Sequence, residues 1–178
     1  MNLTNRFIFF LLSCSLLASC NGDKRQISTV PANSTTHEII LDSKVQIIES
    51  NKVFDQFELK QGTSNVFFHE KVGEAYLGDD QYDVKYWEVL VFEFDPTIES
   101  FEYQNEDLAK LNCYYLWRAA AKSLIKESIP VKNGLIKGER LTDGRWQLKI
   151  NIDPKYKVNE SSRKINIDVE VNTVPNKT

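Results

Sequence analysis

Hydrophobic and polar residues alternate most regularly near the carboxyl end of this chain. Every second residue is apolar in residues 145–153, and residues 164–171 repeat the pattern. Because the side chains of a strand point alternately to its two faces, this pattern predicts antiparallel strands with one buried face and one face in water. Asp143-Gly144 is a turn pair that favours a tight hairpin between residues 135–141 and the first of these strands. A two-residue loop and a bulged three-residue loop both fit this sequence.

The run from Tyr82 to Asp95 is the strongest strand pattern, and its middle is apolar on both faces. Leu90 and Phe92 lie on one face, while Val89 and Val91 lie on the other. This pattern indicates a central strand that is covered on both sides, or covered on one side and in contact with a partner on the other. Shorter strand patterns occupy residues 38–48, 53–59, 66–68 and 98–103.

A helical pattern extends from about Asp107 to Ser128. Asn105 is a suitable N-cap, and Pro130 would end the helix. Mostly apolar positions recur at helical spacing and form one stripe: Leu108, Leu111, Tyr115, Leu116, Ala119, Ser123 and Leu124. We therefore expect one long α-helix over residues 107–128.

Strands, then one helix, then further strands predict an α+β fold. We expect a curved antiparallel sheet of about six to eight strands packed on the long helix. A cone-like sheet wrapped on the helix and a two-layer sandwich with the helix on top both fit this order. The domain is expected to span residues 37–178, and the polar, aperiodic residues 20–36 are expected to form a flexible tether.

Residues 1–19 have the layout of a removable export signal. Arg6 gives a basic start, and residues 7–17 form an apolar run that is too short to span a bilayer. The run ends in Leu17-Ala18-Ser19-Cys20, which resembles the lipobox of bacterial lipoproteins. The resemblance implies cleavage before Cys20, a diacylglycerol on the Cys20 thiol, and acylation of the new amino terminus by a fatty acid such as palmitate. An ordinary secretory signal with a chance cysteine is the alternative.

The residue after the lipobox and the net charge limit where the domain acts. Asp after the lipidated cysteine resembles an inner-membrane retention signal, so Asn21 favours the outer membrane. The domain would then face the periplasm, with exposure on the cell surface as the other arrangement. Removal of Arg6 changes the formal net charge from −3 to −4, which argues against nucleic acid and anionic lipid as partners. Membrane contact is therefore expected through the lipid anchor alone.

The sequence offers little metal-binding or catalytic chemistry. His37 and His69 are the only histidines, and motifs for nucleophiles and phosphate loops are absent. We therefore expect no metal, no cofactor and no catalytic residue. His37 lies at the edge of the tether, and His69 is interpreted as a peripheral position on a strand. Cys113 is the one unmodified cysteine left after processing, and we interpret it as a buried, inert thiol.

Tyr114, Trp117 and Arg118 are the candidate partner surface. Tyr114 and Trp117 lie three residues apart, off the main stripe of the expected helix and beside Arg118. These residue types are enriched at binding hot spots, and packing in the core is the alternative.

These features favour a non-catalytic, membrane-anchored envelope lipoprotein that binds a protein or an envelope component. An immunity lipoprotein that neutralises a toxin delivered to the periplasm is one alternative. An envelope hydrolase or transferase with an unrecognised site is another.

Overall fold

The structure is a computed structural model that describes residues 33–48, 56–76, 83–119, 127–155 and 164–176. These residues form eleven strands and a short 3₁₀ helix, η2(Asn105–Leu111). The strands are β1(Ser34–Ile48), β2(Gln56–Gln61), β3(Ser64–Tyr76), β4(Asp83–Phe94), β5(Ser100–Gln104), β6(Tyr114–Ala119), β7(Glu127–Pro130), β8(Gly134–Arg140), β9(Trp146–Ile152), β10(Ile165–Val171) and β11(Thr173–Val174).

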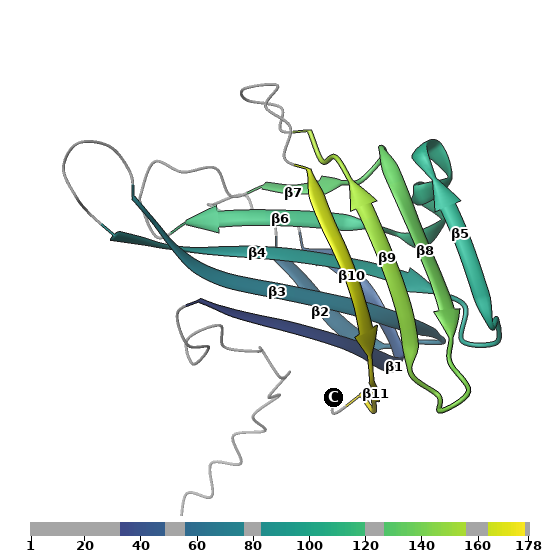
Figure 1. The fold of residues 1–178 in the computed structure, drawn as a ribbon. Helices are drawn as coiled ribbons and strands as arrows, with labels where there is room; N and C mark the ends of the chain where they lie inside the picture. The colour runs from purple at the N-terminus through teal and green to yellow at the C-terminus, as the bar shows by residue number, and fades with distance from the viewer. Residues whose placement is uncertain (1–32, 49–55, 77–82, 120–126, 156–163, 177–178) are drawn as a thin grey trace, which may run out of the picture.

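The strands form two sheets that we call sheet A and sheet B. Sheet A has seven strands in the order β11-β1-β3-β4-β6-β7, with β2 paired to β1 off this path, and sheet B has the order β10-β9-β8-β5. All pairs are antiparallel except that of β1 with β11. The strands of sheet B cross those of sheet A at a steep angle (Figure 1). We call the face of sheet A toward sheet B its inner face and the opposite face its outer face.

β1 pairs with β3 and β2, the two strands that follow it, and the three strands together form a long, bent antiparallel unit that we call the bent hairpin. The first half of β1 pairs with β3 and the second half with β2, and the register shifts between Ile40 and Ser43. Asp42 in the bend has a φ of 50°, and its carbonyl accepts a hydrogen bond from Gly62 N at 2.8 Å. A Cβ at Gly62 would lie 2.8 Å from the Ser43 backbone, so this close approach requires glycine.

The bend carries β2 and the second half of β1 onto the outer face of sheet A. Val45 and Phe57 pack there in a cluster with Phe68 and Val91, and the rings of Phe57 and Phe68 are 5.9 Å apart. Sheet A is therefore a middle layer, with sheet B on its inner face and the bent hairpin on its outer face.

The position of β4 confirms the prediction of a central strand covered on both sides. β4 lies between β3 and β6 in sheet A. Leu90 and Phe92 are buried in the cluster on the inner face, and Val89 and Val91 are buried in the cluster on the outer face.

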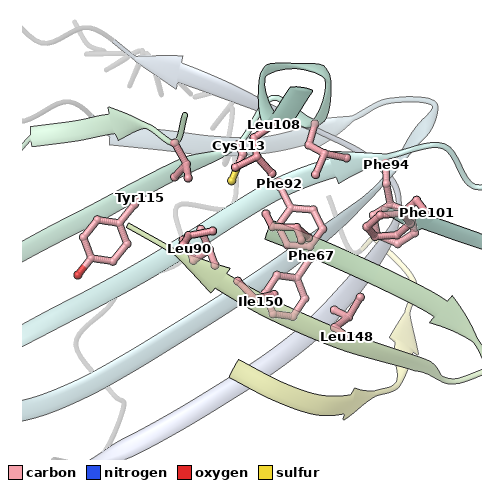
Figure 2. Close-up of a cluster of buried hydrophobic side chains, with 14 of the residues drawn as sticks. Phe67, Leu90, Phe92, Phe94, Phe101, Leu108, Cys113, Tyr115, Leu148 and Ile150 are labelled. Carbon is pink, nitrogen blue, oxygen red and sulfur yellow. The ribbon is translucent and has the colours of Figure 1, made fainter. Parts of the chain in front are cut away.

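The main hydrophobic core lies between the inner face of sheet A and sheet B. Large side chains from both sheets meet there (Figure 2): Phe67, Leu90, Phe92, Leu148 and Ile150. Phe94 of β4 packs edge-on against Trp146 of β9, with ring centroids 4.9 Å apart. Because full burial of one such side chain contributes about 1.5–3 kcal/mol, these contacts hold the two sheets together.

The long α-helix predicted over residues 107–128 is wrong. In the described part of this range the helical residues belong to η2, and Asn112 then adopts a left-handed conformation (φ 46°, ψ 51°) that ends the helix. β6 and β7 follow, and residues 120–126 lie outside the described residues. The α+β class is therefore wrong as well, because the described residues form a curled, mainly antiparallel β structure with one short helix.

The helical spacing was misleading because β6 is covered on both faces. Leu108 and Leu111 are buried as a helical stripe predicts, and both belong to η2. Tyr115 and Leu116 are also buried, but on the inner and the outer face of a strand. A strand covered on both sides is apolar at consecutive positions, and a short run of this kind resembles a segment of a buried helix.

The strands at the carboxyl end confirm the alternating pattern. β9 and β10 pair along their whole length, with Leu148, Ile150 and Ile165 buried. The turn between β8 and β9 resolves the open choice of loop. Leu141 N donates to Arg145 O at 2.7 Å, and Gly144 has a φ of 86°, which gives the bulged three-residue loop.

The residues after Val171 join the two sheets. β11 follows β10 directly and pairs in parallel with β1 at Ile39 and Ile40. Ile39 N also donates to Asn172 O at 3.2 Å. The chain thus passes from sheet B into sheet A within a few residues.

Candidate functional site

The inner face of sheet A changes from apolar to polar along its length. β3 and β4 continue past β10, so sheet B covers only part of this face (Figure 1). Leu90 and Tyr115 belong to the core, and His69 lies opposite Leu90 in the ladder. Glu88 comes two residues before Leu90 and lies opposite Trp117. Because directly paired residues share a face, as do residues two apart on a strand, these polar groups lie together on the inner face.

His37 and His69 contact each other across β1 and β3. They are directly paired in the ladder, and their ring centroids are 4.9 Å apart. The two Nδ1 atoms are 3.3 Å apart, a distance at which one nitrogen donates a hydrogen bond to the other. His69 is 3% exposed, whereas His37 is half-buried and its ring stacks on Phe67.

Glu88 lies on the other side of the His69 ring. Its carboxylate is buried, and Oε1 is 3.9 Å from His69 Nε2. This distance is too long for a direct hydrogen bond, but it is short for two ionisable groups away from water. We call Glu88, His69 and His37 the Glu–His–His chain. The Glu–His–His chain runs from the buried carboxylate of Glu88 to the half-buried imidazole of His37, across β4, β3 and β1.

The surroundings of His37 favour its neutral form. Burial lowers the pKa of His37 below its usual value of 6.5, and the neighbouring His69 lowers it further. Both effects disfavour a positive charge on the ring. At neutral pH His37 is therefore an uncharged imidazole with one nitrogen that donates and one that accepts.

Aromatic side chains continue the inner face beyond Glu88. The ring of Tyr86 stacks on Trp117, with centroids 6.4 Å apart. Tyr86 lies opposite Gly73, and a Cβ there would be 2.5 Å from the Tyr86 ring, so glycine makes room for the tyrosine. Trp117 Nε1 is buried and has no hydrogen-bond partner within the described part of the chain.

The three residues of the predicted partner surface do not lie on one face. Trp117 packs against the inner cluster, whereas Tyr114 packs against the outer cluster. Arg118 occupies the ladder position opposite Trp87. Their expected proximity followed from helical spacing, and in a strand residues three apart face opposite sides. Of the three, only Trp117 adjoins the Glu–His–His chain.

The Glu–His–His chain was missed because its residues are far apart in sequence. His37 was interpreted as the edge of a tether, although β1 begins at Ser34. His69 was interpreted as a peripheral strand position, but it is buried. The register between β1 and β3 brings the two rings together, and one sequence without partners for its strands does not reveal that register.

The other predicted groups are placed as follows. Cys113 is buried in the core, and burial raises the pKa of its thiol, which confirms the prediction of a buried cysteine. Cys20 lies outside the described residues. Among the residues that the structure describes, no three His, Cys, Asp or Glu side chains are grouped so that they could hold a metal ion.

Comparison with known proteins gives no relative for this chain: no protein family, curated protein or solved structure matches it. Across the described ranges, no helix is both long enough and apolar enough to cross a membrane. The amino-terminal motif and the inner face of sheet A are thus the two features that bear on function.

Proposed function

We propose that this protein is a membrane-anchored envelope lipoprotein whose β domain binds a protein or an envelope component without catalysing a reaction. The Leu17-Ala18-Ser19-Cys20 motif supports the anchor, and the inner face of sheet A around the Glu–His–His chain is the proposed binding surface. This face continues past sheet B, and it carries ionisable residues next to the core.

The observation that carries the binding surface is the burial of His69 and Glu88. Their exposed fractions are 3% and 5%, at positions directly beside Leu90 and Tyr115 of the core. Burial of ionisable groups costs free energy that apolar side chains would not cost. A binding role for these groups accounts for that cost.

The anchor is tested by the change Cys20→Ser. In a bacterial host fed with a fatty-acid probe, we expect the wild-type protein to be labelled and the variant to remain unlabelled. The wild-type protein should also fractionate with membranes through its acyl chains, because two or more chains hold persistently where one does not. Labelling of the variant would show that another residue is modified and would exclude the lipobox.

The binding surface is tested by capture from envelope extract with the full-length protein in detergent. Glu88→Gln changes a buried carboxylate of the proposed surface. Glu102→Gln is the matched control, since Glu102 is exposed on sheet B, where it pairs with Lys137. We expect the same partner to be retained by the wild type and by Glu102→Gln and to be lost with Glu88→Gln. Equal capture by all three proteins, or turnover of a wall fragment with no partner recovered, would contradict the proposed function.

A further inference from the structure

Sheet B ends at β10 in an edge without a partner strand. Within the described residues, β10 pairs with β9 alone, and its seven residues make it the longest strand with a ladder on one side only. In an antiparallel ladder, every second residue directs its N–H and C=O away from the partner strand. β10 therefore presents a row of backbone donors and acceptors to which another extended chain can bind.

The apolar side of β10 is incompletely covered. Ile167 and Val169 point toward sheet A and pack against the main core, yet both are only partly buried. Their ladder partners on β9, Ile150 and Leu148, are 2% and 0% exposed. Burial on the core side of sheet B thus decreases at its last strand, and a further strand beside β10 would cover the exposed parts of Ile167 and Val169.

The inner face of sheet A extends beyond this edge. β3 and β4 continue past β10 (Figure 1), so a strand added beside β10 would lie over the inner face of sheet A. Stacked sheets are about 10 Å apart, which leaves room for one layer of side chains between the added strand and sheet A. Alternate side chains of the added strand would thus be buried against the inner face, and apolar residues suit these positions.

A second copy of this chain does not fit the edge. A symmetric pair of β10 strands is antiparallel, with the twofold axis perpendicular to the sheets, so both copies of sheet A lie on the same side. β3 and β4 of each copy would then extend into the space that sheet A of the other copy needs (Figure 1). A single extended peptide has no second layer, and it therefore fits where a second copy does not.

The side of β10 that faces away from sheet A is acidic. Asp168 and Glu170 are exposed there. The basic residues that pair with them, Lys149 and Arg145, lie on β9 and in the turn before it, one strand further from the edge. Opposite charges on directly paired residues of adjacent strands attract each other. Lys or Arg residues of the added strand would therefore pair with these two carboxylates.

We propose that β10 binds an extended segment of a partner protein as an additional strand of sheet B. In this segment, apolar side chains toward sheet A alternate with Lys or Arg side chains toward water. Backbone hydrogen bonds to β10 provide the affinity, and the alternating side chains provide the specificity. This inference rests on the proposed binding role of the inner face and deepens it, because it names the kind of partner and the way in which the partner binds.

Amide hydrogen exchange in the ¹⁵N-labelled full-length protein, in a non-ionic detergent, tests the edge. We expect the amides of β10 to alternate between slow and fast exchange, because only those that donate to β9 are protected. The probe is a capped nine-residue peptide that alternates Val with Lys. It should slow the fast amides of β10 in a saturable manner and leave β5, at the opposite edge of sheet B, unchanged. The same peptide with Glu in place of Lys should protect β10 far less.

Three results would overturn the proposal. Uniformly slow exchange along β10 in the free protein would show that the edge is already covered. Protection that rises with protein concentration in the absence of peptide would assign the edge to a second copy. Unchanged exchange at saturating Val–Lys peptide would show that β10 does not accept an added strand of this kind.

Charge reversal at the two edges of sheet B gives matched variants. Asp168 and Glu102 lie in the same cross-strand row, and each is exposed beside a lysine of the neighbouring strand, Lys149 and Lys137 respectively. Asp168→Lys should raise the dissociation constant of the Val–Lys peptide about fivefold, while Glu102→Lys should leave it unchanged. Denaturation midpoints establish that both variants are folded. Equal affinities of the two variants would overturn the position of the added strand.

These measurements need no envelope extract, so they are independent of the capture experiment. If the peptide protects β10 but no partner is captured, strand addition holds and the proposed function fails. If a partner that depends on Glu88 is captured but leaves the exchange of the β10 amides unchanged, the proposed function holds and strand addition is overturned.

Discussion

Glu93 and Glu88 show that neighbouring carboxylates on one strand have different roles. Glu93 Oε1 accepts hydrogen bonds from Val45 N at 2.8 Å and from Asn112 Nδ2 at 2.6 Å. It thereby joins the bent hairpin to the residue that ends η2. Glu88 lies five residues earlier in β4, on the inner face, and its Oε1 is 3.9 Å from Nε2 of the buried His69. The first carboxylate therefore has a structural role, whereas the second belongs to the proposed binding surface.

Glu93→Ala should destabilise the domain by about 2–3 kcal/mol. The change leaves a backbone N–H and a side-chain amide without their charged acceptor, and each such loss is costly in a part-buried place. Chemical denaturation of the wild type and the variant measures this difference. Glu102→Ala, which breaks an exposed ion pair, should cost less than about 1 kcal/mol. Equal effects of the two changes would mean that Glu93 does not hold the outer layer.

The lowered pKa of His37 gives the domain a pH dependence between neutral and mildly acidic solution. Below pH 6.5 the unfolded chain takes up a proton at this residue before the folded protein does. Because the unfolded state then binds more protons, the free energy of unfolding falls as the pH decreases. The groups that face His37 on the inner face are His69, Glu88 and Lys71.

We therefore expect His37→Phe to lose part of the stability decrease seen in the wild type between pH 7.5 and pH 5.5. Denaturant titrations at several pH values measure the two slopes. Carboxylates with lowered pKa values, such as Asp95 and Asp143, affect both proteins alike. A variant slope equal to that of the wild type would show that His37 does not titrate differently on folding.

At the level of elements, the sequence predicts strands with one solvent-exposed face far better than strands with both faces buried. β9 and β10 alternate because one face contacts the core and the other contacts water. β6 has consecutive apolar residues because both of its faces are covered by other parts of the protein. Helical spacing fits such a short apolar run by chance. β11 is two residues long, and nothing in its polar surroundings indicates the pairing with β1.

The candidate site was less predictable than the strands. Trp117 was predicted to belong to a partner surface together with Tyr114 and Arg118 on a helix, but it lies in β6. His37 and His69 are 32 positions apart, and their contact depends on a bulge-containing register in a long hairpin. Hydrophobic patterns fix which face a residue occupies, whereas they leave open which residue of another strand it meets.

Gly138→Ala should destabilise sheet B by about 1–3 kcal/mol. A Cβ at this position would be 2.4 Å from Phe101 Cε1 and 3.0 Å from Leu148 Cδ2, so the added methyl group overpacks the core. Ser100→Ala on the exposed side of β5 serves as the control and should change the denaturation midpoint little. If Gly138→Ala is neutral, the Phe101 ring has room to move and the core at this end is loosely packed.

For the whole molecule, the important connection is the short step from β10 to β11. β11 ties the last strand of sheet B to β1 of sheet A, and Val174 packs against the outer cluster. β1 therefore pairs with three strands of sheet A, which are β3, β2 and β11, and β11 follows directly from β10 of sheet B. A change at the carboxyl end is expected to affect the packing of both sheets.

Truncation after Val171 should lower the free energy of unfolding by about 2–3 kcal/mol. It removes the ladder with β1 and the Asn172 carbonyl that accepts from Ile39 N, and each backbone hydrogen bond contributes about 0.5–1.5 kcal/mol. Truncation after Asn176, which keeps β11, is the control and should leave the denaturation midpoint unchanged. Matching midpoints for the two truncated proteins would show that β11 adds no stability.

The bent hairpin also has a mechanical consequence. β1 begins at Ser34 and lies inside sheet A with β3 along one side. In an antiparallel ladder the hydrogen bonds are perpendicular to the strands, so a pull along β1 loads the whole ladder in shear and does not peel it apart one bond at a time. A protein tethered by its amino-terminal side would thus withstand drag on a bound partner, with the His37 contact lying only three residues from the point where the force enters.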